Sequence, residues 1–205
     1  MISGRSTDQA REQGFTLIEM MIGMAMGLII LAGLTMLFVS YGDSSRAMAS
    51  RTERMGDLYL ASHVMQAGLR ESLSVPDATT SILTNLASRS ITAPTGYPAS
   101  DATFTALPYW DATSKTITYQ DLEGNVGIFQ YQRTANDRIY WLRPLAAGVT
   151  GSSTFQELMR DLDTSSGMTV TVSGGNVTVT LTSAYTNENK QGKTLSLTFK
   201  TWPRN

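Results

Sequence analysis

The chain has 205 residues, of which 41% are hydrophobic and 16% charged, and its formal net charge at pH 7 is −1. This near-neutral charge, with no evident basic patch, gives no electrostatic case for nucleic-acid binding. The absence of cysteine excludes disulfides and thiolate metal sites, and a single histidine, His63, leaves no second imidazole for a metal site. We therefore expect neither a cofactor nor a bound metal.

Residues 1–14 are polar and of mixed charge, and a long apolar run follows them. Between Phe15 and Gly42 the only charged residue is Glu19. The uncharged stretch 20–41 would span about 33 Å as a helix at roughly 1.5 Å per residue, which is enough to cross a hydrocarbon core of about 30 Å. A carboxylate in such a run costs roughly 2.5–3.5 kcal/mol on insertion scales, so Glu19 needs a partner.

The helical pattern continues beyond the apolar run. Hydrophobic residues recur at helical spacing, separated by arginines and acids, at Met48, Met55, Leu58, Met65, Leu69 and Leu73. Pro76 is unfavourable for continuing the helix. We predict one helix over about 15–74, apolar all round within 15–41 and amphipathic within 42–75.

Residues 76–205 are predicted to form a β-rich head. A stretch rich in Thr, Ser, Ala and Pro comes first, with a short helical turn expected near 81–87. Segments rich in β-branched and aromatic residues then predict strands within 115–122, 125–134, 137–144, 167–183 and 193–202, with turns at Gly124–Asn125 and Ala135–Asn136–Asp137. Alternating Val and Thr around Gly174–Gly175 predict a hairpin, whereas TFQELMRDL over 154–162 is compatible with a helix or a strand.

The stretch GFTLIE, Gly14 to Glu19, with the apolar helix behind it, resembles the class III signal peptide of type IV pilins and pseudopilins. In that family a prepilin peptidase cuts after the glycine and methylates the new amino terminus. By this resemblance, residues 1–14 are a leader peptide, the cut falls between Gly14 and Phe15, and Phe15 becomes N-methylated. The mature chain would have 191 residues (205 − 14).

The resemblance also implies an α+β, pilin-like fold, in which a long N-terminal helix, transmembrane in its first half, packs on an antiparallel β-sheet. Glu19 is the fifth mature residue, where the family carries a glutamate. In a bundle of such helices it can meet the Phe15 amine of a neighbouring subunit, which neutralises both charges. The alternative is a glutamate that snorkels at the interface of an ordinary membrane anchor.

Two further features of the apolar run bear on helix packing. Gly23 and Gly27 form a small-xxx-small pair that would permit close approach of another helix. Major pilins usually carry a proline where this chain has Met36, which puts the family's helix kink in question and leaves Gly33 as a candidate point of flexibility.

The region from Gly56 to Ser72 is similar to PilW-type minor pilins, with the J-type pseudopilin of type II secretion close behind. The implied function is a minor type IV pilin, processed by prepilin peptidase and incorporated into a pilus or priming its assembly. The alternative is a minor pseudopilin of a type II secretion system. The implied partners are other minor pilins, the major pilin, the prepilin peptidase, an inner-membrane platform protein and a cytoplasmic assembly ATPase.

The same resemblance implies a single crossing of the inner membrane with a periplasmic head before assembly, and a place in the pilus at the cell surface afterwards. A membrane-anchored periplasmic enzyme or binding protein is the interpretation from another class. Any histidine-based triad would have to recruit His63 from the long helix, and neither a nucleophile elbow nor HExxH is present. We predict no catalytic residues and no enzymatic activity.

Two weaker signals remain in the head. The segment Asp161–Gly167 resembles a calcium loop in part, but its glycine comes one place late and Val172 stands where the loop needs a glutamate. Three tryptophans either line a ligand surface or pack in the core of the sheet: Trp110, Trp141 and Trp202.

Overall fold

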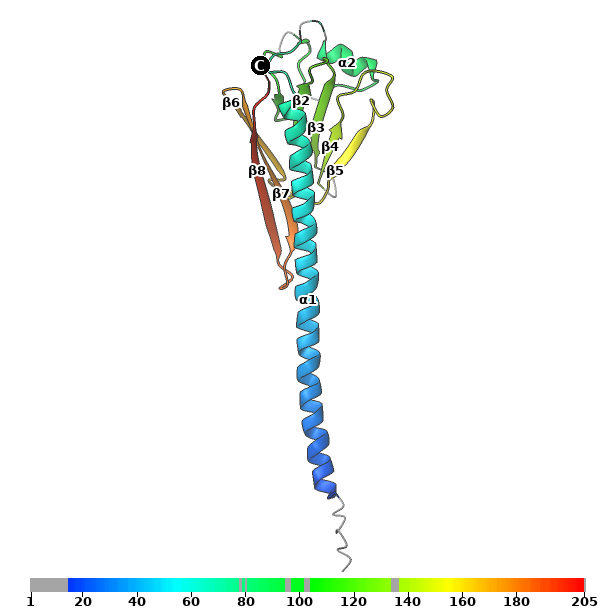
Figure 1. Ribbon diagram of the computed structural model, residues 1–205, viewed down its shortest axis with the longest axis vertical. Coiled ribbons are helices and arrows are strands. Elements are labelled where there is room, and N and C mark those ends of the chain that lie inside the picture. The colour runs from blue at the N-terminus through cyan, green and yellow to red at the C-terminus, as the bar shows by residue number, and fades with distance from the viewer. Residues whose placement is uncertain are drawn as a thin grey trace, which may run out of the picture. The chain divides into compact units, whose positions relative to one another are not determined.

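The computed structural model describes residues 15–77, 79, 81–94, 97–101, 104–133 and 137–204. The predicted leader 1–14, including Gly14, and positions 135–136 of one predicted turn lie outside the described residues. The chain divides into two units, 1–46 and 47–205, and helix α1 (Leu17–Arg70) contributes residues to both (Figure 1).

Helix α1 confirms the predicted long helix and is uninterrupted through all its glycines. It ends at Arg70, earlier than the predicted Ser74, because the next residues pair with strands instead. The Leu73 N–H donates to the carbonyl of Gln120 at 2.8 Å, and Leu73 forms a parallel bridge with Arg204. The helix therefore stops before Pro76 could end it.

A five-stranded antiparallel meander follows a short helix, α2 (Ile82–Ser88), which confirms the predicted helical turn. Its strands pair in chain order: β1 (Tyr109–Asp111), β2 (Thr116–Gln120), β3 (Val126–Gln132), β4 (Arg138–Leu142) and β5 (Phe155–Met159). The ambiguous segment 154–162 is thus a strand, and β1 is an addition to the predicted set.

The remaining strands form a second sheet. The sequence analysis expected one antiparallel sheet, and the structure has two. Strands β6 (Met168–Ser173), β7 (Asn176–Thr186) and β8 (Gly192–Thr201) pair in that order, and β6–β7 is the predicted hairpin. Between the sheets the chain bends at Asp161, whose φ is +55°, and Leu162 forms only an isolated bridge to Ser183.

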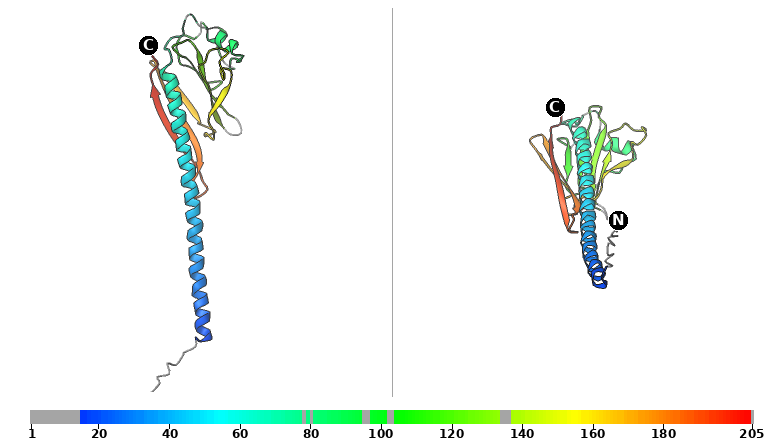
Figure 2. Two further views of the ribbon diagram at one scale, coloured as in Figure 1. Left: turned by 45° about the vertical axis from the view of Figure 1, so that its right-hand side comes forward. Right: turned by 60° about the horizontal axis from the view of Figure 1, so that its bottom comes forward.

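The larger hydrophobic core lies between the second half of α1 and both sheets (Figures 1 and 2). The buried stripe of the helix is Leu58, Ala61, Met65 and Leu69, at spacings of three and four residues. The predicted stripe began earlier, but Met48 is 73% exposed and Met55 37% exposed. A smaller core lies under α2, built around Ile82, Leu86, Phe104, Ile128 and Leu142.

Tyr119 of β2 is the central contact between helix and sheet. Its ring stacks on Phe129, with 5.3 Å between ring centroids, and its hydroxyl accepts a hydrogen bond from the Trp141 indole at 2.8 Å. It also fills the space beside two glycines. A Cβ on Gly127 would lie 2.3 Å from the tyrosine ring, and one on Gly68 would lie 2.9 Å from the hydroxyl. Both positions therefore require glycine for close packing.

Candidate functional site

The start of helix α1 is fixed by a reciprocal pair of side chains. The backbone N–H and the hydroxyl of Thr16 donate to Glu19 Oε2 at 3.2 and 3.1 Å, and the Glu19 N–H donates to Thr16 Oγ1 at 3.3 Å. This is a capping box, and an acid in the first turn also complements the helix dipole. The sequence Thr16-Leu17-Ile18-Glu19 has the spacing of a capping box. Glu19 therefore has a hydrogen-bond partner, Thr16, within its own chain, which was not part of either the filament-pairing or the snorkelling interpretation.

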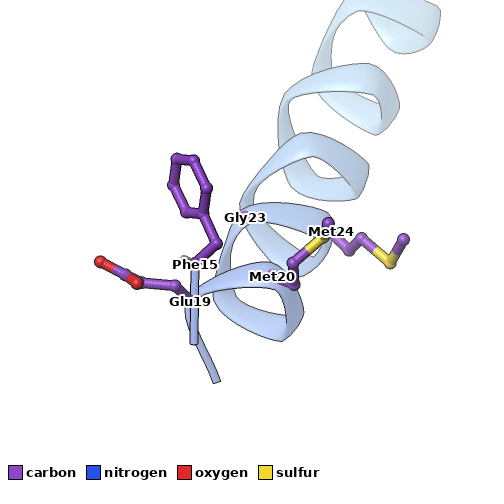
Figure 3. A pocket seen from close by; sticks show the side chains of 5 residues that line it. All are labelled: Phe15, Glu19, Met20, Gly23 and Met24. Carbon is purple, nitrogen blue, oxygen red and sulfur yellow. The ribbon is translucent and has the colours of Figure 1, made fainter. Parts of the chain in front are cut away.

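Glu19 shares one helix face with two other predicted site residues, Phe15 and Gly23, at intervals of four. Together with Met20 and Met24 these residues line a shallow hollow (Figure 3). In Figure 3 the side chains of Phe15 and Glu19 point to one side of the helix and those of the methionines to the other. Among the described residues that line the hollow, Glu19 carries the only ionisable side chain, and Phe15 would carry the new amino terminus.

The first part of α1 presents its apolar side chains on every face. All large hydrophobic side chains from Phe15 to Tyr41 are exposed, from 47% at Leu34 to 82% at Phe15. The helix is long and apolar enough to cross a membrane, and its most apolar window has no buried residue. Continuous apolar surface of this kind is covered by lipid or by other helices.

The predicted small-residue face is open. At Gly23 and Gly27, as at Gly33, an added Cβ would meet no atom of the described chain within 4 Å. A helix could approach the backbone closely along this face. No described segment of the chain packs against the two glycines, so their role in helix packing stays a prediction.

Two acids of the head, Asp161 and Asp163, are engaged in structural contacts. Arg54 of α1 forms an ion pair with Asp161 at 2.7 Å. The carboxylate of Asp163 accepts hydrogen bonds from the side chains and backbone of Ser165 and Ser166, which hold the pKa of that carboxyl below its usual value. Both acids of the partial calcium loop therefore have protein partners.

His63 is exposed on α1, and within the described part of the chain no three His, Asp or Glu residues are grouped to hold a metal ion. The tryptophans differ in burial. Trp141 is partly buried and packs against the core through Phe129, with 5.9 Å between ring centroids, whereas Trp202 is 62% exposed. A ligand surface at the tryptophans stays a prediction. Trp110 is half-buried at the edge of the larger core.

A buried arginine that the sequence pattern did not single out ties the loops of the first sheet together. The Arg89 guanidinium is 2% exposed and donates to the carbonyls of Val126, Arg143 and Ser152. Burial lowers the pKa of this group. Its three partners lie 37 to 63 residues further along the chain, so no local sequence pattern predicts these hydrogen bonds.

Residues 9–35 match the prokaryotic N-terminal methylation motif. The matched range covers 27 of the 205 residues (35 − 9 + 1) and includes Gly14, Phe15, Glu19, Gly23 and Gly27. No curated protein and no solved structure matches the chain. The motif indicates a prepilin-peptidase substrate of the type IV pilin or pseudopilin kind. Its described part, 15–35, comprises the helix cap and the exposed beginning of α1.

Proposed function

We propose that the chain is a minor type IV pilin, a structural subunit that prepilin peptidase cuts between Gly14 and Phe15 and that then enters a pilus or primes its assembly. The observation that carries the proposal is the first part of α1. A capping box at Thr16 and Glu19 begins a helix whose large apolar side chains are all exposed up to Tyr41. The N-terminal methylation motif covers most of that segment.

The chemistry of this segment suits transfer from lipid into a filament. Cleavage leaves a positive amine on Phe15, and N-methylation retains that charge. When helices bundle, Glu19 of one subunit can neutralise the Phe15 amine of the next, which removes the cost of roughly 2.5–3.5 kcal/mol that an unpaired charge has in a membrane. On assembly the exposed apolar side chains leave lipid and pack against neighbouring helices, so they stay out of water throughout.

The proposal implies an inner-membrane subunit with a periplasmic head before assembly, and a surface pilus subunit afterwards. Its partners are the other minor pilins, the major pilin, the prepilin peptidase and the inner-membrane platform protein. A minor pseudopilin of a type II secretion system would share the processing and the helix, and would differ in the filament that it enters.

The test is mass spectrometry of filaments sheared from the cell surface. Digestion after glutamate releases the short peptide Phe15–Glu19, which is one methyl group heavier if the amino terminus is methylated. Finding this peptide in sheared filaments supports a pilin. A strain without prepilin peptidase is the matched control and should lack the peptide.

Two other outcomes count against the proposal as stated. If the processed peptide occurs only in the membrane fraction, a periplasmic pseudopilus becomes the better account. If the chain remains uncut while the peptidase processes other prepilins in the same cells, both filament functions are wrong.

A further inference from the structure

Strand β6 is an edge strand without the features that usually protect an edge. It lies at one side of the second sheet, and its pairing with β7 runs from Met168 to Ser173 without a bulge. Residues 164–187 include neither a charged residue nor a proline. Natural proteins protect their edge strands with charged side chains, proline or bulges. Strand β6 is therefore open to pairing with a strand of another chain.

The backbone groups on the open side of β6 have no partner among the described residues. The Thr182 N–H donates to the carbonyl of Gly167 at 3.0 Å, and bonds to β7 recur at every second residue from there. Thr169 and Thr171 therefore direct their backbone groups toward β7. Val170 and Val172 direct theirs away from it, and no hydrogen bond within the described chain includes these outward groups.

Strand β8 forms the other edge of the same sheet. Its stretch Thr194–Phe199 is uncharged and has six residues (199 − 194 + 1), the length of β6, and a lysine stands at each end of it. Both β6 and β8 pair with β7 in antiparallel fashion, so they run in the same direction. Strand β6 of one copy can therefore pair in parallel with β8 of the next copy.

The two edges also match in the side chains that each face carries. On the face toward the core both strands carry apolar residues: Met168, Val170 and Val172 on β6, and Leu195, Leu197 and Phe199 on β8. On the outer face both carry hydroxyls: Thr169 and Thr171 on β6, and Ser196 and Thr198 on β8. Placing Val170 opposite Leu197 joins apolar rows to apolar rows and hydroxyls to hydroxyls.

The same register satisfies the backbone. Leu197 bonds toward β7, so its neighbours Ser196 and Thr198 direct their backbone groups to the open side of β8. The outward N–H of Val170 then faces the carbonyl of Ser196, and the N–H of Thr198 faces the carbonyl of Val170. The chain thus supplies both halves of one contact.

The direction of the helix selects this contact over an antiparallel pair of β6 strands. The segments after α1 and β8 run in parallel, with a bridge between Leu73 and Arg204 (Figure 1). Antiparallel pairing would therefore point the second halves of two α1 helices in opposite directions. Copies anchored in one membrane point the same way, and in this respect the inference rests on the proposed function.

We propose that copies of this chain associate through parallel pairing of β6 of one copy with β8 of the next. The contact covers the side chain of Val172, which is 44% exposed, and extends the sheet from one subunit into another. It joins two different edges, so each pair retains one free β6 and one free β8 and can add a further copy.

The experiment is disulfide cross-linking of the full chain in uncharged detergent micelles. The natural chain has no cysteine, so Thr171→Cys and Thr198→Cys, placed in separate copies and mixed, report the expected register. Within one copy, β7 separates the two positions by roughly 9–10 Å, which is too far for a disulfide. We expect a mixed dimer on mild oxidation. Thr194→Cys, at an equally open position of β8, replaces Thr198→Cys as the matched control and should give little mixed dimer.

A proline tests whether the backbone edge makes the contact. Val172→Pro removes an N–H that points away from β7, so it spares the sheet and blocks the neighbour. In the Thr171→Cys copy it should lower the yield of mixed dimer about fivefold or more, as loss of a backbone hydrogen bond predicts. Val172→Thr keeps the N–H and should preserve the yield. Thermal melting by circular dichroism shows that each variant is folded.

Three results would overturn the proposal. The first is as much mixed dimer with Thr194→Cys as with Thr198→Cys, which would indicate random collision. The second is a higher yield from Thr171→Cys alone, which would indicate antiparallel β6 pairs. The third is an undiminished yield in folded Val172→Pro. The experiment needs neither cleavage nor a pilus, so its failure leaves the proposed function standing, and an uncut chain in cells would refute that function separately.

Discussion

At the scale of single residues, Glu19 combines two functions that chemistry can separate. It closes a capping box with Thr16, and in the proposed filament its charge meets a neighbouring amine. Glutamine also closes capping boxes but carries no charge. Glu19→Gln therefore keeps the capping box and removes the charge, whereas Thr16→Val removes the cap and keeps the charge.

We expect Glu19→Gln to lower the amount of subunit in sheared filaments by about tenfold or more, because a charge-assisted hydrogen bond contributes about 1.5–3 kcal/mol. Thr16→Val should lose only the cap, at about 1 kcal/mol of helix stability, and should still enter filaments. Immunoblots of sheared and whole-cell fractions measure both effects. Normal incorporation of Glu19→Gln, or equal loss in Thr16→Val, would assign Glu19 to the cap alone.

Asp111 provides a residue-scale prediction on pH. Burial acts to raise the pKa of its carboxyl, but hydrogen bonds from Ser114 and Thr113 outweigh that effect and leave the pKa below its usual value. A depressed pKa in the folded state stabilises the protein above the unfolded pKa of about 3.9, and this contribution is lost as pH falls through the folded pKa.

Asp111→Asn should therefore be less stable than the natural chain at pH 7, and the difference should narrow at pH 3. Urea unfolding at the two pH values measures it. Asp43→Asn is the control, because its ion pair with Arg46 spans 3.8 Å at an exposed site and contributes little. A difference that stays constant between the two pH values would show that Asp111 acts through its shape and not its charge.

At the scale of secondary-structure elements, the second half of α1 packs against the first sheet, and Tyr119 lies at the contact. The ring occupies space that a methyl group on Gly68 or Gly127 would need. This arrangement sets how closely the helix approaches the strands. Neither glycine carries a positive φ, so the requirement for glycine comes from packing and not from backbone conformation.

Gly127→Ala should destabilise the head by about 1–3 kcal/mol, the usual cost of overpacking a core. Gly192→Ala on β8 is the matched control, since an added Cβ there meets nothing within 4 Å, and it should change stability by no more than about 0.5 kcal/mol. Chemical denaturation of both variants makes the comparison. Equal stability would show that Tyr119 moves aside at no cost.

The sequence predicts those elements whose determinants are local. Helix α1, helix α2, strands β2–β4, the β6–β7 hairpin and strand β8 follow from hydrophobic period, β-branched residues and turn residues within each segment. The end of α1 does not, because it depends on pairing of Leu73 with Gln120 and Arg204. The division into two sheets depends on β5 and β6 not pairing, which no pattern within either strand shows. Strand β1 pairs locally with β2, but its three residues are too few to show a hydrophobic period.

The candidate sites show the same distinction. The cleavage and capping residues lie together in GFTLIE, so the sequence alone predicts their chemistry. Arg70 of α1 and Lys200 of β8 line one surface hollow although they lie 130 positions apart in the chain (200 − 70), and no local pattern could have placed them together. Among the residues that line this hollow, the sequence analysis singled out only Trp202, for its aromatic ring.

At the scale of the whole molecule, the two units differ in what they bury. All buried hydrophobic residues of the described chain lie between Leu58 and Phe199. The part of α1 before Ala47 contributes none of them and exposes its apolar side chains instead. The head therefore contains its own core, and the first part of the helix depends on an external apolar environment.

We expect a fragment of residues 47–205 to be soluble and folded and to unfold cooperatively, whereas the full chain should partition into membranes or detergent. Circular dichroism and size-exclusion chromatography of the fragment, with fractionation of the full chain, measure both properties. An aggregated fragment, or one that melts without a cooperative transition, would show that the head needs the first part of α1 to fold.

The junction at Ser72–Ser74 has a mechanical consequence. A tensile force that arrives along α1 leaves the helix at these residues and divides between two sets of bonds, one to β2 through Gln120 and one to the C-terminal segment through Arg204. The junction therefore distributes the force over both sheets. Separating the end of α1 from β2 breaks the hydrogen bond to Gln120, and separating it from the C-terminal segment breaks the two hydrogen bonds with Arg204.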